Sequence, residues 1–96
     1  MQRRFVWDRS KAAANELKHG VSFEEATSAF DDPDAVTVYD EEHSRLEDRY
    51  ILLGMSPKFR VLFVVHAEVT PEVVRIISAR RATRAERDVY EKKLDT

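Results

Sequence analysis

A chain of 96 residues, 43% of them apolar and 35% charged, supports one hydrophobic core and predicts a single domain over residues 1–96. Sixteen Lys and Arg against eighteen Asp and Glu give a formal charge of −2, so a histone-like polycation is excluded and any nucleic-acid site must be local. The absence of cysteine excludes a disulfide framework, a thiolate zinc site and a cysteine nucleophile.

The first predicted elements are a short strand and a helix. Residues 5–7 form an apolar, β-prone run, and Asp8 follows at the position of a helix N-cap. Residues 9–19 are good helix formers, and Gly20 supplies the left-handed conformation that ends many helices. We therefore expect a strand that leads directly into a helix.

A second helix and a second strand follow. Ser22 and Glu25 have the spacing of a capping box, which predicts a short helix ending near Phe30. Residues 35–39 alternate in polarity and are rich in β-branched side chains, which predicts a strand. The acidic residues after this strand are typical of a polar loop.

The second half of the chain is predicted to contain three strands and a closing helix. The strands are residues 49–54, 60–66 and 73–80, each with many β-branched or aromatic side chains. A second capping box at residues 83–86 predicts a C-terminal helix ending near Leu94. Apolar residues occur on both faces of these strands, so we expect both faces of the sheet to be covered, at least in part.

The predicted order of elements is β-α-α-β-β-β-β-α, which is typical of an α+β fold. We expect a single antiparallel sheet packed against two N-terminal helices and one C-terminal helix. Arg75 and Arg80 are five residues apart on one strand, so a regular strand places them on opposite faces of the sheet. On that basis the two arginines cannot serve one site.

Charge is distributed unevenly along the chain. Residues 1–19 carry five basic and two acidic side chains, residues 22–48 one basic and ten acidic, and residues 49–94 ten basic and five acidic. The sequence therefore predicts two cationic regions on either side of an acidic one. Solvated faces of an ordinary domain are the alternative explanation.

Neither a metal site nor a membrane segment is predicted. His19, His43 and His66 have no metal-ligand spacing with one another, so we expect no metal and no cofactor. The longest apolar run, residues 61–65, is well short of the roughly 20 residues that a membrane span needs. Residues 1–4 are followed by no signal-peptide core, so a cytoplasmic protein is expected.

Two long motifs carry a family resemblance. The chain opens with FVWDRSKAAANELKHGVSFEEA at residues 5–26 and closes with RIISARRATRAERDVY at residues 75–90, with FDDP between them. Together these motifs resemble the BrnT toxins of bacterial type II toxin–antitoxin systems. The resemblance covers nearly the whole chain, and residues 35–46 are its least distinctive part.

The resemblance implies a fold, an activity and a partner. It implies a compact RelE-like fold and endonucleolytic cleavage of RNA, which inhibits translation and arrests growth. It also implies neutralisation by a BrnA-like antitoxin whose ribbon-helix-helix domain binds operator DNA, so that the toxin reaches DNA only through the complex. A non-catalytic module of the same fold, which binds RNA or a partner, is the alternative.

RNA cleavage without a metal needs a base for the 2′-hydroxyl proton, cations for the phosphorane and an acid for the leaving 5′-oxygen. RelE-like toxins commonly place an arginine late in the sheet and an aromatic hydroxyl on the last helix, and Arg80 and Tyr90 match those positions. Arg49 is a second candidate, since a guanidinium binds two phosphate oxygens at once. Surface ion pairs for both arginines, and a place in the core for Tyr90, are the alternative roles.

Two further side chains are candidates for acid–base chemistry. Glu86 is an i,i+4 neighbour of Tyr90, but it is also placed to complete a capping box with Thr83. His19 lies beside Lys18 at a helix C-terminus, where a capping role is the alternative.

RNA binding is assigned to cations of the two basic regions. Lys11, Asn15 and Lys18 recur at i, i+4 and i+7, which predicts a polar, cationic helix face that either binds phosphate or faces water. The other candidates lie around the C-terminal helix: Arg81, Arg84 and Arg87. Residues 75–93 carry seven Lys and Arg against three Asp and Glu, so we expect the antitoxin to cover this surface.

Overall fold

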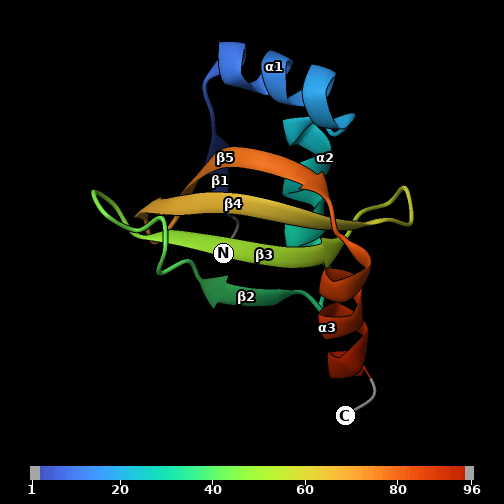
Figure 1. The fold of residues 1–96 in the computed structure, drawn as a ribbon. Coiled ribbons are helices and arrows are strands. Elements are labelled where there is room, and N and C mark those ends of the chain that lie inside the picture. Colours follow the sequence, from blue (N-terminus) through green and yellow to red (C-terminus); the bar gives the residue numbers. More distant parts are fainter. Residues whose placement is uncertain (1–2, 95–96) are drawn as a thin grey trace.

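The computed structural model describes residues 3–94, and their side chains as far as residue 92. One five-stranded sheet with the strand order β1-β5-β4-β3-β2 forms its centre (Figure 1). The strands are β1 (Arg4–Val6), β2 (Val36–Tyr39), β3 (Arg49–Met55), β4 (Val61–Thr70) and β5 (Val73–Arg81). The helices are α1 (Arg9–His19), α2 (Phe23–Ser28), the 3₁₀ turn η1 (Ala29–Asp31) and α3 (Arg84–Leu94). None of the described helices is long and apolar enough to span a membrane.

All five predicted strands are present, although β4 continues to Thr70 and not to residue 66, and the prediction of an all-antiparallel sheet is wrong. β2, β3, β4 and β5 pair antiparallel in turn, whereas β1 pairs parallel to β5, with Val6 opposite Arg75. These two strands are distant in sequence, so no tight turn between them dictates their relative direction. The sheet is therefore mixed.

The helical predictions are partly right. α1 has the predicted bounds and ends at Gly20, whose φ of 69° is left-handed. α2 stops at Ser28 instead of near Phe30, and the chain continues as η1. The hydroxyls of Thr27 and Ser28 donate hydrogen bonds to backbone carbonyls three residues earlier. Such bonds compete with regular helix geometry, which explains the early end of the second predicted N-terminal helix.

α1 and α2 cover one face of the sheet, and α3 packs at a corner of the other (Figure 1). The main core lies on the α1 and α2 side and consists of Val21, Phe23, Ala26, Ala29, Leu52, Leu62, Val64, Val74, Ile76 and Ala79. A smaller cluster lies on the α3 side and consists of Leu53, Val61, Ala82 and Tyr90. We call the face opposite α1 and α2 the open face; from β3 it carries Arg49, Ile51 and Leu53.

Asn15 fastens α1 to β5. Its buried amide donates hydrogen bonds to two backbone carbonyls, including that of Ala79 at 2.8 Å, and accepts one from the Ala79 N–H at 3.1 Å. β1 pairs with β5 only as far as Arg75, so Asn15 takes the place of a strand partner at the outer edge of β5. The predicted polar row is corrected accordingly: Asn15 faces inward, while Lys11 and Lys18 are exposed.

A β-bulge in β5 changes which of its residues face the core. The register between β4 and β5 shifts by one residue, which leaves Ile77 without a partner on β4. Ile76 before the bulge and Ala79 after it both belong to the main core, although a regular strand places them on opposite faces. Arg75 and Arg80 consequently both point to the open face, and the prediction that they lie on opposite faces is wrong.

Replacing Asn15 by Ala tests the fastening of α1 to β5. Asn15→Ala removes three hydrogen bonds and leaves both backbone polar groups of Ala79 without these partners. We expect the free energy of unfolding to fall by about 2–3 kcal/mol, measured by urea denaturation. Glu16→Ala, on the exposed side of the same helix, is the control and should change stability by less than about 0.5 kcal/mol. Equal stability of the two variants contradicts this role of Asn15.

Candidate nucleic-acid interface

The bulge puts Arg80 on the open face that already carries Arg49 and Arg75. Arg49 of β3 and Arg75 of β5 are both paired with Ala67 of β4, so they lie on either side of one strand at the same level. Arg80 is paired with Phe63, four residues along β4, which corresponds to about 13 Å at roughly 3.3 Å per residue. The open face therefore has a cation pair at one end and a single cation toward the other.

Glu47 joins Arg49 and Arg75 into one ion-pair cluster. Arg75 donates a hydrogen bond to Glu47 Oε1, and Arg49 Nε lies 3.5 Å from the same oxygen. The side chains of Arg49 and Glu47 are both 34% exposed, and that of Arg75 is 40% exposed. Arg49 Nε is itself buried and has no hydrogen-bond partner among the described residues, because its contact with Glu47 is an ion pair only. Two guanidiniums on one carboxylate leave donors to spare for a phosphate.

Arg80 is held by Glu86 and by Phe63. Its two terminal nitrogens donate to the two carboxylate oxygens of Glu86 at 2.8 and 2.9 Å, and its guanidinium carbon lies 3.9 Å from the centre of the Phe63 ring. The hydrogen bonds between the two side chains lower the pKa of Glu86 and raise the pKa of Arg80. Glu86 also exchanges hydrogen bonds with Thr83 at 2.8 and 3.2 Å, which confirms the predicted capping box.

Tyr90 lies in the core and contacts a different partner from the one expected. It is 3% exposed, and its hydroxyl donates to Asp32 Oδ2 at 2.5 Å. Burial and this hydrogen bond raise the pKa of Tyr90. Burial also raises the pKa of Asp32, but hydrogen bonds from two backbone N–H groups and from Tyr90 outweigh it and lower that pKa. The structure thus pairs Arg80 with Glu86, and Tyr90 anchors α3 to the segment after η1.

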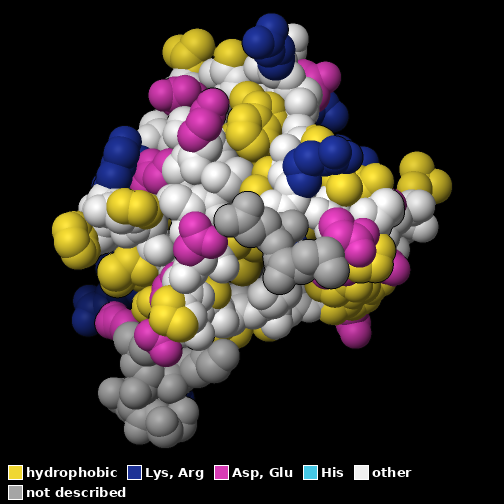
Figure 2. Space-filling model, turned by 180° about the vertical axis from the view of Figure 1, so that it is seen from behind, with side chains coloured by type: hydrophobic (Ala, Val, Ile, Leu, Met, Phe, Trp, Pro, Cys, Tyr) yellow, Lys and Arg dark blue, Asp and Glu magenta, His cyan; other side chains and the backbone are white. Residues whose placement is uncertain are grey.

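The candidates on α1 are separated along the helix. Lys11, near its start, lines a small cavity of about 130 Å³ together with Arg49 and Arg75. Lys18 and His19 lie in the last turn of the helix. On the side of the molecule seen in Figure 2, basic and acidic side chains are interspersed and form no continuous basic patch. Lys11 therefore belongs with the first arginine cluster, and the end of α1 does not.

A groove of about 630 Å³ separates α3 from the turn between β3 and β4. The basic residues that line it are Arg60, Arg81 and Arg87. Arg60 is committed to the fold, because it donates two hydrogen bonds to the buried carboxylate of Glu25. Of the predicted RNA-binding residues, Arg81 and Arg87 share this groove, whereas Arg84 is exposed outside its lining.

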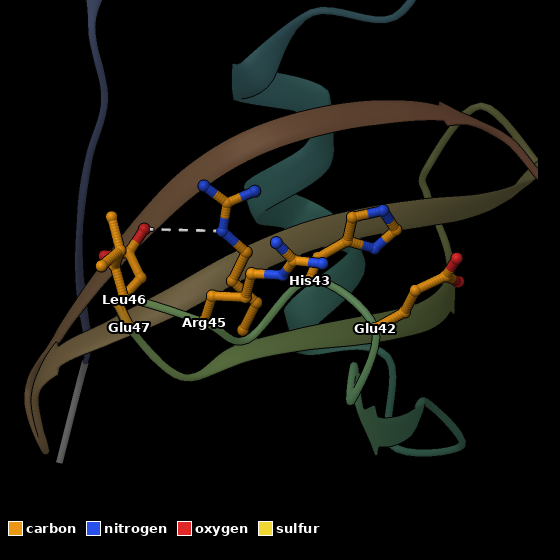
Figure 3. Close-up of a pocket in the computed structure, with 6 residues that line it drawn as sticks. Glu42, His43, Arg45, Leu46 and Glu47 are labelled. Atoms are coloured by element: carbon orange, nitrogen blue, oxygen red, sulfur yellow. Dashed lines mark ion pairs between the residues drawn. The ribbon is translucent and has the colours of Figure 1, made fainter.

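The loop between β2 and β3, residues 40–48, was not predicted to take part in a site. It forms a pocket of about 580 Å³ lined by Glu42, His43, Arg45, Leu46, Glu47 and Arg49 (Figure 3). Beside this pocket, His43 Nδ1 lies 3.0 Å from Asp40 Oδ2. The i,i+3 spacing of Asp40 and His43 is the feature of the sequence that indicates this pair. It is hard to recognise because other acidic residues surround it.

The open face supplies the groups that phosphate chemistry uses. Guanidiniums bind phosphate oxygens in pairs and stabilise negative charge that develops on them. Glu47 and Glu86 place a carboxylate, a possible proton acceptor, beside each arginine group. Within the described part of the chain, no three His, Cys, Asp or Glu side chains are grouped to hold a metal ion.

Comparison with known proteins gives one family and one fold. A family model described as the ribonuclease toxin BrnT of type II toxin–antitoxin systems matches residues 7–86. The crystal structure of the Brucella abortus ribonuclease toxin BrnT is similar, with a TM-score of 0.68 at 22% sequence identity over 86% of this chain and 100% of that one. At this identity the likeness shows a shared fold. The comparison with curated proteins gave no match.

The pH dependence of stability tests the Arg80–Glu86 ion pair. Because the pKa of Glu86 lies below its ordinary 4.5, the stabilisation is complete above pH 4.5 and is lost as the pH falls through the lowered pKa. We expect Glu86→Gln to cost about 1 kcal/mol at neutral pH, and the difference from wild type to shrink below pH 4.5. Urea denaturation across this range measures it, with the exposed Glu91→Gln on the same helix as control. A difference independent of pH contradicts the ion pair.

Proposed function

Because this chain belongs to the BrnT family of ribonuclease toxins of type II toxin–antitoxin systems, we propose that it is an RNA endonuclease that works without a metal ion. The proposal includes a single domain with a RelE-like fold that cleaves RNA in the cytoplasm, inhibits translation and arrests growth. A BrnA-like antitoxin neutralises it, and the ribbon-helix-helix domain of that antitoxin binds operator DNA for the complex.

The observation that supports this proposal most directly is the presence of Arg49, Arg75 and Arg80 on one open face. No helix of the described chain covers this face except α3 at its corner. Exposed guanidiniums on such a surface bind the phosphates of an extended strand of RNA. Their carboxylate partners supply a proton acceptor for the 2′-hydroxyl at the same place.

The candidate catalytic residues differ in where the structure places them. Arg49, Arg80 and Glu86 keep their place in the proposal, because all three lie at the open face and are partly exposed. Tyr90 is a positioning residue, since its buried hydroxyl is bonded to Asp32. His19, in the last turn of α1, does not line the cavity that Lys11 shares with Arg49 and Arg75, and its part in acid–base chemistry stays a prediction.

Two measurements test the proposed activity: the chemical ends of the cleaved RNA, and the cleavage rates of two arginine variants. Attack by the 2′-hydroxyl leaves a 2′,3′-cyclic phosphate and a 5′-hydroxyl, so we expect these ends on the cleaved RNA. We expect the same cleavage in the presence of a metal chelator. Because Arg49 and Arg80 lie about 13 Å apart, only one of them can face the phosphorane. Substitution of that arginine by Ala should lower the single-turnover rate by about 10²–10³-fold, by analogy with the loss of an oxyanion-hole donor, and substitution of the other should mainly weaken RNA binding. Arg9→Ala, an exposed arginine of α1, is the matched control.

Two outcomes decide between an enzyme and a binding module. If wild-type protein binds RNA and leaves it intact, the chain is a non-catalytic module that uses the same arginines. If wild-type protein cleaves RNA and both variants cleave at its rate, the arginines form only surface ion pairs, worth at most about 1 kcal/mol each. Melting temperatures of the variants identify any rate loss caused by unfolding.

The place of the antitoxin is a further part of the proposal. We expect it to cover the basic surface of β5 and α3, where seven Lys and Arg stand against three Asp and Glu in residues 75–93. Binding should then weaken as salt is added, because exposed charges are screened. Hydrogen exchange of the free and bound toxin locates the contact. Protection confined to residues 35–48 contradicts this placement.

A further inference from the structure

We propose that the loop between β2 and β3 carries the proton transfers of RNA cleavage, with Glu47 as the general base and His43 as the general acid. This inference rests on the proposed function, since it assigns groups to that reaction. It follows from three features of the loop: the way Asp40 holds His43, the way Ser44 fixes the loop, and the arrangement of side chains around its pocket.

Asp40 holds the imidazole ring of His43 in one orientation. His43 Nδ1 lies 3.0 and 3.2 Å from the two carboxylate oxygens of Asp40. The Asp40 side chain is only 10% exposed, whereas that of His43 is 62% exposed. A carboxylate accepts hydrogen bonds and does not donate them, so Nδ1 carries the hydrogen. Nε2, on the other side of the ring, is then the nitrogen that exchanges a proton with a substrate.

Ser44 fixes the loop to the start of β3. Its hydroxyl donates to the Asp40 carbonyl at 2.5 Å and accepts from the Arg49 N–H at 2.9 Å. The Asp40 N–H in turn donates to the Arg49 carbonyl at 2.9 Å. His43 and Arg49 are therefore mounted on one hydrogen-bonded framework. A proton donor and a phosphate ligand that act on the same phosphate must be held in a fixed relative position, and this framework provides such preorganisation.

The pocket places the two proposed proton-transfer groups apart, with cations between them. His43 and Glu47 both line it, and Figure 3 shows them on opposite sides with Arg45 between. Glu47 is also bound to Arg75 and paired with Arg49. In phosphoryl transfer the attacking and leaving oxygens stand roughly in line across phosphorus, so base and acid belong on opposite sides of the phosphate. Carboxylate, guanidinium and imidazole stand in that order across this pocket.

The proposed step is balanced without any further reactant. The Glu47 carboxylate takes the proton of the 2′-hydroxyl, the bond from the 2′-oxygen to phosphorus forms, and the bond from phosphorus to the 5′-oxygen breaks. His43, protonated at Nε2, gives that proton to the 5′-oxygen. The products are a 2′,3′-cyclic phosphate and a 5′-hydroxyl, and solvent returns the proton from Glu47 to His43. Arg45 and Arg49, which line the pocket, face the charge of the phosphorane.

The test uses two RNA substrates that differ in one atom at the bond that wild-type protein cleaves. In the second substrate sulfur replaces the 5′-bridging oxygen, and a thiolate leaves without a proton because its conjugate acid is much stronger than an alcohol. We expect His43→Ala to cleave the ordinary substrate about 10²–10⁴-fold more slowly than wild type, and the sulfur substrate at the wild-type rate. Glu47→Gln should slow both substrates. Glu41→Gln, exposed in the same loop, is the control and should slow neither.

The outcomes for His43 and Glu47 are separate, and Glu47→Gln that cleaves both substrates at the wild-type rate overturns the role of Glu47. The ratio of the two rates is measured within one variant, so a partly unfolded sample does not change it. His43→Gln keeps a donor toward Asp40 and should show the same ratio if His43→Ala fails to fold. Equal losses on both substrates, or no loss on either, overturn the role of His43. Wild-type protein that cleaves no RNA overturns the proposed function itself.

Discussion

The outer edge of β5 is the constraint on which the rest of the structure depends. β1 provides partners only as far as Arg75, and buried N–H and C=O groups beyond that point must still be bonded. Asn15 bonds both backbone groups of Ala79 and so holds that residue against the main core. With Ile77 bulged out before it, Ala79 can face inward only if Arg80 faces outward. One side-chain amide thereby helps to place Arg80 on the open face that carries Arg49 and Arg75.

The arginines of this protein differ in how firmly their carboxylate partners hold them. Glu25 has a side chain only 5% exposed, and the hydrogen bond from Arg60 lowers its pKa. Breaking a buried pair of this kind costs about 3–5 kcal/mol, so Arg60 serves the fold. The pairs of Arg49, Arg75 and Arg80 are about one-third exposed, and such pairs contribute roughly 0–1 kcal/mol. A phosphate can displace their carboxylates at little cost, which favours these three arginines for binding RNA.

The two proposed parts of the site are joined by Glu47 and Arg49. Glu47 accepts from Arg75 of β5 and faces the pocket of the β2–β3 loop, where His43 lies on the other side. Arg49 belongs to the arginine cluster through its side chain and to the loop framework through its backbone. RNA bound along the open face therefore presents a phosphate to the same loop that carries the proposed acid and base.

The sequence by itself determined the features that depend on neighbouring residues. The bounds of α1, its end at Gly20 and the capping box of Thr83 and Glu86 follow from local rules, and each was predicted. Membership of the BrnT family followed from two long motifs. The tertiary structure alone decided the parallel pairing of β1, the inward turn of Asn15 and the bond of Tyr90 to Asp32, 58 residues away. It also decided that Arg75 and Arg80 share a face, because one extra residue in a strand reverses every side chain after it.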